Sequence, residues 1–323
     1  MELIGYTGRD EVAMVYLAEL GEGRLIEFVE SVQPPLTREK KWVLMVSTLF
    51  GCPVQCLMCD AGSFYRGKLT AEEMLAQIDF LVDKRFPGRV IPSDNFKIQF
   101  ARMGEPALNP AVLDVLKVLP DRYLAPGLMP SFSTIAPAGR EDFFEELTRI
   151  KDSLYGAGRF QFQFSVHTTD ETLRDRLIPA KKWNFQEMAK FGERFFQVGD
   201  RKITLNFSLA QDMPVDPALL LRFFDPERYL IKITPLNPTY KASHSGLTSY
   251  IDPLDQDREY RVVRELQEAH YQVIVSVGER EENRIGSNCG QYVMTHLREK
   301  EKIAEGYHFD VVTEQGERLR RNA

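Results

Sequence analysis

The sequence predicts an α/β fold in which six strand–helix units form a partial (βα)6 TIM-like barrel. Six apolar, β-rich runs alternate with amphipathic helical stretches along most of the chain. This alternation favours a parallel sheet with crossover helices. The chain has 323 residues, of which 43% are hydrophobic, so it can bury the core that such a domain needs.

The six predicted strands are runs rich in β-branched and aromatic residues, each bounded by polar or turn-forming residues. In barrels of this kind, chemistry takes place on the loops that leave the carboxyl ends of the strands. We expect the strands at residues 42–49, 96–101, 128–135, 160–167, 203–209 and 229–235.

The predicted helices lie between these strands and carry recognisable start signals. Thr70 and Glu73 form a capping box at the start of the first helix, and Pro110 suits the first position of the second. The helices are expected at residues 70–86, 110–119, 141–151, 184–198, 217–224 and 254–269.

Two further segments flank the predicted barrel of residues 41–270. Residues 1–40 are expected to form a short N-terminal β-hairpin cap, with strands at 12–20 and 24–32 joined by a glycine turn. Residues 271–323 are expected to form a C-terminal extension. It would hold a short strand at 272–277, a polar loop, a helix that starts near Ser287 and carries Cys289, and a charged tail.

Composition limits the classes of partner. The formal net charge is −6, whereas nucleic-acid binders usually carry a basic surface, so a large RNA is not expected. No apolar run is long enough to cross a membrane, and no signal peptide follows Met1. Three of the four cysteines stand in one motif, which argues for a reducing compartment, and we expect a cytoplasmic protein with no membrane partner.

The cysteine motif is the strongest chemical signal. Cys52, Cys56 and Cys59 stand as C-P-V-Q-C-L-M-C directly after the first predicted strand. Structural zinc sites prefer C-x2-C pairs and four protein ligands, and the remaining alternative is a chance group of buried thiols. Three close thiolates can instead hold three irons of a [4Fe–4S] cluster and leave the fourth open to a small molecule. This spacing is typical of radical S-adenosylmethionine (SAM) enzymes.

Small polar groups follow the other predicted strands and suit a SAM site on the same rim. In M-G-E-P, Gly104 permits close backbone approach and Glu105 can accept the ammonium of a methionine moiety. The remaining candidates end later strands, where they suit ribose hydroxyls, a carboxylate or adenine edges. They are Ser133, Ser165, Val166, His167 and Asn237.

These stretches together resemble the RlmN/Cfr group of radical SAM enzymes, which methylate an adenine ring carbon in RNA. The matching segments are V-S-T-L-F-G-C-P-V-Q-C-L-M-C, M-G-E-P-A-L-N, F-S-V-H, R-D-R-L-I-P-A-K-K, I-T-P-L-N-P and N-C-G-Q, which span residues 40–295. The resemblance implies that Gly104, Glu105, Ser133, Ser165, Val166, His167 and Asn237 surround SAM.

The same resemblance implies two catalytic residues. Cys289 matches the cysteine that accepts a methyl group from one SAM, before a radical made from a second SAM activates that methyl. Glu27 matches the proton-accepting glutamate of the family. A flavodoxin or ferredoxin is the kind of reductant that such an enzyme needs.

Two departures change the expected substrate. The family carries a second redox cysteine seven positions before the first cluster ligand, and this chain has Met45 there. A thioether cannot form the disulfide that releases the product. Only about 40 residues precede the first barrel strand, so the N-terminal RNA-binding domain is expected to be absent and rRNA is not the expected substrate.

We therefore predict a radical SAM methyltransferase that acts on an unreactive carbon, with Cys289 as methyl carrier. Its substrate would be a small molecule, a peptide or a small RNA. Two alternatives stay open: a radical hydrogen-transfer or rearrangement enzyme in which Cys289 donates a hydrogen atom, and a sensor that holds the cluster and SAM without turnover.

Overall fold

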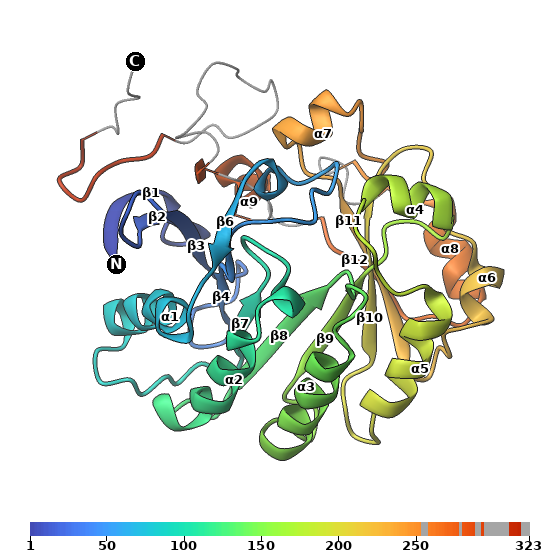
Figure 1. Cartoon of the computed structure of the whole chain (residues 1–323), viewed down its shortest axis with the longest axis horizontal. Helices are drawn as coiled ribbons and strands as arrows, with labels where there is room; N and C mark the ends of the chain where they lie inside the picture. Colours follow the sequence, from blue (N-terminus) through green and yellow to red (C-terminus); the bar gives the residue numbers. More distant parts are fainter. Residues whose placement is uncertain (253–257, 278–279, 288–291, 294–309, 318–323) are drawn as a thin grey trace.

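The structure is a computed structural model that describes residues 1–252, 258–277, 280–287, 292–293 and 310–317. Its backbone is dominated by one ten-stranded sheet in the order β1-β2-β3-β4-β7-β8-β9-β10-β11-β12. Figure 1 shows this sheet strongly curved, with most helices on its outer, convex side. Within the described ranges, no helix has both the length and the apolar character that a membrane crossing requires.

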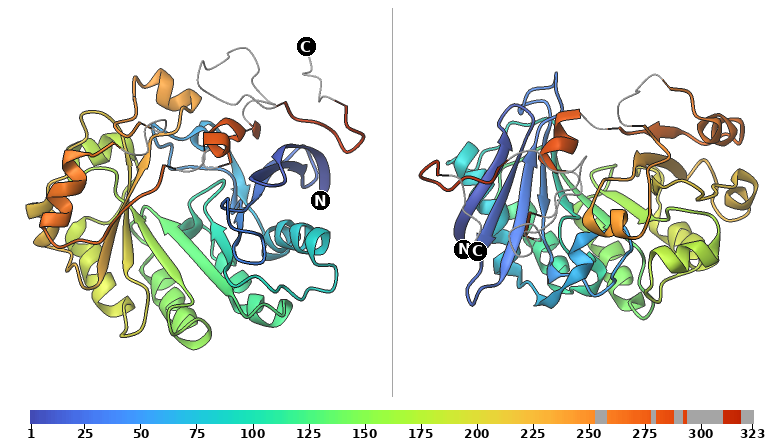
Figure 2. Two further views of the ribbon diagram at one scale, coloured as in Figure 1. Left: turned by 180° about the vertical axis from the view of Figure 1, so that it is seen from behind. Right: turned by 90° about the horizontal axis from the view of Figure 1, so that it is seen from above.

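The predicted N-terminal hairpin is present but is only part of the segment. Strands β2 (Ala13–Glu19) and β3 (Leu25–Ser31) pair antiparallel, as expected. An additional strand, β1 (Glu2–Arg9), pairs with β2, and β3 pairs antiparallel with β4 (Trp42–Val46). These strands therefore continue the main sheet, as the views in Figure 2 also show.

The parallel part of the sheet confirms the partial barrel. Every predicted strand lies where the apolar runs placed it, and β4 and the strands from β7 to β12 run parallel in chain order. The sheet does not close, because β1 and β12 are its two ends. The remaining parallel strands are β7 (Phe96–Phe100), β8 (Leu128–Thr134), β9 (Gln161–Ser165), β10 (Ile203–Leu209), β11 (Tyr229–Pro235) and β12 (Val273–Val275).

The two faces of the parallel strands differ in polarity. In β7, Phe96, Ile98 and Phe100 are buried in the main apolar cluster, which also holds residues of the outer helices. The alternate residues Lys97 and Gln99 are half-buried and point to the other face, because successive side chains of a strand alternate. The outer face therefore forms the core, and polar side chains occupy the inner face.

The outer helices follow the predicted pattern. The capping box at the start of α1 (Ala71–Arg85) is confirmed: Glu73 N donates to Thr70 Oγ1 at 3.1 Å, and Thr70 N donates to Glu73 Oε2 at 2.8 Å. The other predicted helices are α2 (Ala111–Arg122), α3 (Glu141–Leu154), α5 (Phe185–Phe195), α6 (Pro217–Leu221) and α8 (Arg261–Glu268).

Several short elements have no counterpart in the sequence prediction. Six of them lie on the loops after the parallel strands, where tertiary contacts decide the local structure. They are β5 (Leu49–Gly51), β6 (Tyr65–Lys68), α4 (Glu171–Leu177), α7 (Tyr240–His244) and the 3-10 helices η1 (Asp60–Ser63) and η2 (Pro106–Leu108).

The C-terminal extension contributes the predicted strand as β12, and a short helix, α9 (Arg280–Ile285), precedes Ser287. The predicted helix with Cys289 lies outside the described residues. A division of the chain near residues 40 and 270 remains a proposal.

Candidate functional site

The cysteine loop leaves the carboxyl end of the first parallel strand, on the rim where chemistry was expected. Cys52, Cys56 and Cys59 are each partly buried. The backbone N–H of Cys52 donates to the carbonyl of Phe64 at 3.0 Å, which fastens the loop to the segment that enters β6.

Two glycines allow this loop to fold tightly. Gly51 has φ +81°, and a Cβ on it would lie 2.0 Å from the carbonyl oxygen of Phe64. A Cβ on Gly62 would lie 2.6 Å from Cα of Gln55. Real Cβ atoms do not approach so closely, so both positions require glycine and the triplet sits in a compact turn.

The surroundings of Cys52 and Cys56 disfavour ionisation of their thiols unless a cation is bound beside them. Burial, with a smaller contribution from the Glu105 carboxylate, raises the pKa of Cys52 to about 11 and that of Cys56 to about 12. The backbone amides of Val54, Gln55 and Glu105 hydrogen-bond the Cys52 sulfur and act in the opposite direction. A bound metal centre deprotonates a coordinating thiol outright, and amide donors to sulfur are a feature of iron–sulfur sites.

The donor set suits an iron–sulfur cluster. Such clusters are held by Cys thiolates, and in a [4Fe–4S] cube each thiolate binds a different iron. Cys52, Cys56 and Cys59 are therefore the residues that would hold such a cluster.

The loop between β11 and α7 is hydrogen-bonded to the cysteine loop. Asp60, 1% exposed, accepts hydrogen bonds from the backbone amides of Tyr240 and Lys241 at 3.1 and 2.8 Å. Thr239 Oγ1 donates to the carbonyl of Met58 at 2.8 Å. The start of α7 thus holds the loop in place. Sequence reasoning missed these contacts, although an aspartate directly after the third cysteine was a signal.

Glu105 joins the loop after β7 to the end of β8. Its Oε1 accepts from Thr134 Oγ1 at 2.6 Å and from Ala107 N at 3.0 Å, and its Oε2 accepts from Ile135 N at 2.9 Å. Burial raises the pKa of Glu105 to about 7, against the lowering effect of these three donors. Oε1 already accepts two hydrogen bonds, whereas Oε2 accepts one and can still accept another, so contact of Oε2 with an ammonium group stays feasible.

Gly104 meets the expectation of a special backbone position. Its φ is +103°, and a Cβ there would lie 2.5 Å from Cγ of Leu49. The glycine therefore lets the loop after β7 lie directly against the strand that leads into the cysteine loop.

The other predicted rim residues lie at the carboxyl ends of later strands. Ser133 and Ser165 are half-buried, and Ser133 Oγ accepts from Gln163 Nε2 at 3.0 Å. The Val166 side chain is fully buried in the core, so only its backbone can meet a ligand. Asn237, just beyond β11, is half-buried.

His167 is buried and hydrogen-bonded to the neighbouring strand β10. Its Nδ1 accepts from the backbone N–H of Ser208 at 3.0 Å, and its φ is +68°. Burial, together with the nearby Arg174 charge, lowers the pKa of His167 to about 4. The imidazole is therefore neutral at pH 7, with its proton on Nε2.

Glu27 forms a buried ion pair that sequence analysis did not anticipate. Its Oε1 lies 3.0 Å from Arg102 Nε, and the two side chains are 0% and 1% exposed. Arg102 also donates to the carbonyls of Gly286 at 3.1 Å and Ser287 at 2.8 Å. Glu27 Oε2 accepts from Val293 N at 3.2 Å. One ion pair thus binds two C-terminal stretches to the barrel.

These two stretches flank Cys289, which itself lies outside the described residues. The Glu27 carboxylate responds to opposing effects. Burial raises its pKa, whereas Arg102 and the backbone amides of Tyr292 and Val293 lower it.

Met45 occupies a purely apolar position. It is 7% exposed on β4, in a cluster that includes Val29, Ile285 and Tyr292. The residue therefore packs under the same C-terminal segment that Arg102 holds.

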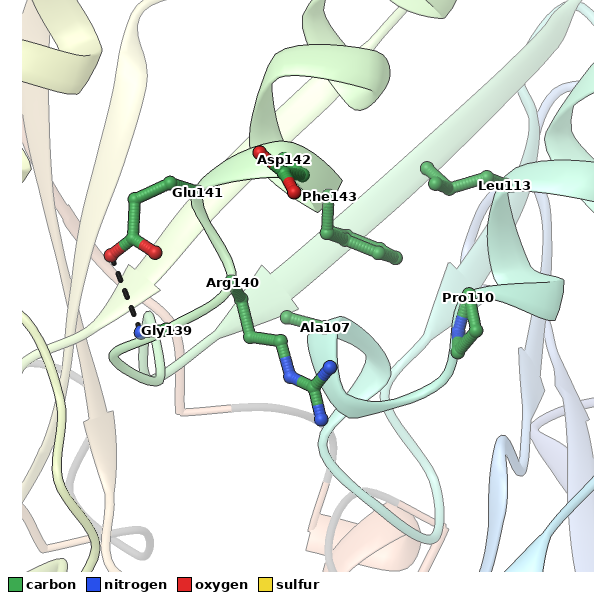
Figure 3. Close-up of a pocket in the computed structure, with 8 residues that line it drawn as sticks. All are labelled: Ala107, Pro110, Leu113, Gly139, Arg140, Glu141, Asp142 and Phe143. Carbon is green, nitrogen blue, oxygen red and sulfur yellow. Dashed lines mark hydrogen bonds between the residues drawn. The ribbon is translucent and has the colours of Figure 1, made fainter.

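A cavity of about 360 Å³ lies nearby but is separate from the predicted site. Figure 3 shows Arg140 among its lining residues and the hydrogen bond from Gly139 N to Glu141 Oε1, which measures 3.3 Å. None of the predicted cofactor residues lines it, so we do not place the chemistry there. Its lining comprises Ala107, Pro110, Leu113, Gly139, Arg140, Glu141, Asp142 and Phe143.

An open parallel barrel with a C-x3-C-x2-C loop after its first strand is the architecture of radical SAM enzymes, and the chain resembles enzymes of this class. The cofactors of the class are a [4Fe–4S] cluster and SAM. No protein-family model matches the sequence.

Curated relatives carry one name, "Probable dual-specificity RNA methyltransferase RlmN". The protein from Synechococcus sp. is 26% identical over 77% of this chain and 70% of its own length. The one from Chlorobium phaeobacteroides is 27% identical over 86% of this chain and 73% of its own length. These matches confirm the resemblance to RlmN-like radical SAM methyltransferases.

Among solved structures, a radical SAM methyltransferase from Sphaerobacter thermophilus has a similar fold. The TM-score is 0.66 at 20% identity, and the match covers 90% of this chain and 80% of the other.

Proposed function

We propose that the protein is a radical SAM methyltransferase that adds a methyl group to an unreactive carbon of a small, non-ribosomal substrate, with Cys289 as methyl carrier. The observation that carries the proposal is the Arg102 side chain. It follows β7, in the loop that holds Gly104 and Glu105, and it binds the carbonyls of Gly286 and Ser287. Two residues of chain span at most about 7 Å, so this anchor favours a thiol near the cofactor rim.

In this proposal, the cysteine triplet holds the cluster, and Glu105 with the rim residues binds SAM. When bound, the cluster and SAM supply the radical chemistry that activates a methyl group. With SAM bound, the Cys289 thiolate would accept the methyl group: the carbon–sulfur bond of the sulfonium would break, a new one would form at Cys289, and S-adenosylhomocysteine would leave. The thiol proton must be lost first, because the thiolate is the nucleophile.

A small polar substrate is favoured by the inner face of the sheet. The half-buried inner positions of β9 and β10 include Gln161, Ser165, Asn206 and Ser208. Complete barrels of this kind fill their interior with branched apolar side chains, whereas these positions suit a hydrogen-bonding ligand. The net charge of −6 also disfavours a large RNA, although the curated relatives are named as RNA methyltransferases.

We propose further that a flavodoxin or ferredoxin supplies electrons and that the enzyme works in the reducing cytoplasm. With Met45 in place of a second redox cysteine, product release needs an external thiol or a direct elimination.

The test is the intact mass of anaerobically purified, cluster-loaded protein after incubation with SAM. The proposal expects one added methyl, localised to Cys289 by peptide mapping and absent from a Cys289→Ser variant. Transfer RNA and rRNA are offered separately as substrates.

The proposal fails if Cys289 stays unmethylated while 5′-deoxyadenosine forms at a normal rate, a result that favours hydrogen transfer. An intact cluster without any SAM cleavage under strong reductant would instead indicate a sensor. Methylation of rRNA would overturn the proposed substrate.

A further inference from the structure

Between β7 and β11, the half-buried inner positions of the sheet carry charge of one sign, whereas the buried carboxylate of Glu27 lies on the same face farther along the sheet, on β3. Two charged side chains occupy these half-buried inner positions, Lys97 on β7 and Lys232 on β11, and both are lysines. Neutral polar residues occupy most of the inner positions on the strands between them.

Lys97 reaches across a neighbouring strand. Its Nζ donates to Gln161 Oε1 at 2.6 Å, although β8 separates their two strands. On the same face, Gln163 Nε2 donates to Ser133 Oγ at 3.0 Å. These contacts show that the polar side chains of three strands meet on the concave side.

The charges nearest to Lys97 are also cationic. Burial lowers the pKa of Lys97 to about 7, and Lys41, Lys232 and Arg201 lower it in the same direction. Lys41 and Arg201 stand just before β4 and β10, so they belong to the amino-terminal end of the barrel. The other three cations make the potential at Lys97 positive, although the Glu282 carboxylate acts on Lys41, and an anion bound beside Lys97 would be attracted to this region.

The distance to the predicted chemistry suits a small molecule. Five residues separate Lys97 from Arg102, which corresponds to about 17 Å along an extended strand. A ligand held near Lys97 at one end can therefore extend along the polar inner face toward the cysteine loop.

We propose that Lys97 and Gln161, with the charges of Lys41, Arg201 and Lys232, bind an anionic group of the substrate, either a carboxylate or a phosphate. This inference rests on the proposed function and specifies its substrate class: a small acid or phosphate ester whose reacting carbon lies at the cofactor rim. Binding is noncovalent. The anion restores the charged form of Lys97, and Gln161 supplies its amide N–H as a second donor.

The experiment measures acetylation of individual lysines by an N-hydroxysulfosuccinimide ester at pH 7, read by peptide mass spectrometry on the anaerobic, cluster-loaded protein. The probes are inorganic phosphate and acetate at constant ionic strength. Lys190, exposed on α5, is the internal control. We expect Lys97 to react at least about tenfold faster than Lys190 without probe, because neutral amine is the reactive form.

A bound anion should slow the reaction of Lys97 at least fivefold and leave Lys190 unchanged. Protection by phosphate assigns a phosphate ester, and protection by acetate alone assigns a carboxylate. Lys97→Met should weaken binding of the protecting anion, measured by calorimetry, at least tenfold, whereas Lys97→Arg should retain most of it.

Absence of protection by both anions overturns the inference, as does equal protection of Lys190. The readout is independent of turnover. If Cys289 takes up a methyl and neither anion protects Lys97, only this inference fails. If an anion protects Lys97 and Cys289 stays unmethylated, only the proposed function fails.

Discussion

Replacement of Arg102 by glutamine should destabilise the protein in a strongly pH-dependent way. The substitution leaves the Glu27 carboxylate buried without its cation, and loss of one partner of a buried pair costs about 3–5 kcal/mol. Glu27 can limit this cost by taking up a proton. When Glu27 is protonated in the folded variant, the loss of stability cannot exceed about 1.4 kcal/mol for each pH unit by which the solution pH lies above the unfolded pKa of glutamate, near 4.3.

The direction of this pH dependence follows from burial, which raises the pKa of Glu27 in the folded protein. A carboxyl whose folded pKa is raised binds more protons when folded, so stability falls as the pH rises above the unfolded pKa. The loss in Arg102→Gln should be about 2 kcal/mol at pH 5.5 and about 3–5 kcal/mol at pH 8.

The assay is thermal unfolding of the anaerobic, cluster-loaded protein. At roughly 2 °C per kcal/mol for a domain of this size, Tm should fall by about 4 °C at pH 5.5 and by about twice that at pH 8. The double variant Arg102→Gln/Glu27→Gln removes both charges and should recover at least half of the loss at pH 8. If the double variant is as unstable as the sum of the single variants, the two side chains are not coupled and the reasoning is wrong.

Three further outcomes are expected. Gly104→Ala should lower the free energy of unfolding by at least about 2 kcal/mol more than Gly199→Ala. Both glycines have positive φ, but only at Gly104 would the added Cβ meet Leu49. Equal losses in the two variants would argue against the clash. Because the folded pKa of His167 is depressed to about 4, stability should fall by up to about 3 kcal/mol from pH 6.5 to 4, and His167→Asn should remove that slope in pH-dependent unfolding. Met45→Cys should leave the iron content of the purified protein unchanged, because the residue lies outside the triplet; loss of iron would contradict the ligand assignment.

The local sequence pattern was sufficient to predict the parallel strands and the residues at their carboxyl ends. The strand runs are long and apolar, and each outer helix needs an amphipathic face to cover them, so the order of elements could be read along the chain. The position of Gly104 and Glu105 followed directly, because residues after a parallel strand reach the same edge of the sheet. The additional strand β1 was missed because it has few large apolar residues and is held by antiparallel pairing to β2 and by a bridge from Tyr6 to the distant Val312.

Contacts between distant segments could not be predicted in this way. Arg102 and Ser287 are 185 residues apart, and Asp60 and Tyr240 are 180 apart, so no periodicity links them. The inner face shows the same limit. Lys97 and Gln161 are unremarkable on separate strands, and only the curvature of the sheet brings them within 2.6 Å.

The sequence by itself determined the class of fold and the cysteine triplet, because strand–helix alternation and ligand spacing are local properties of the chain. Only the tertiary structure decided that Glu27 is paired with Arg102 and that positive charge gathers inside the barrel. Burial and the field of neighbouring charges set the behaviour of an ionisable group, and both arise only when remote segments pack together.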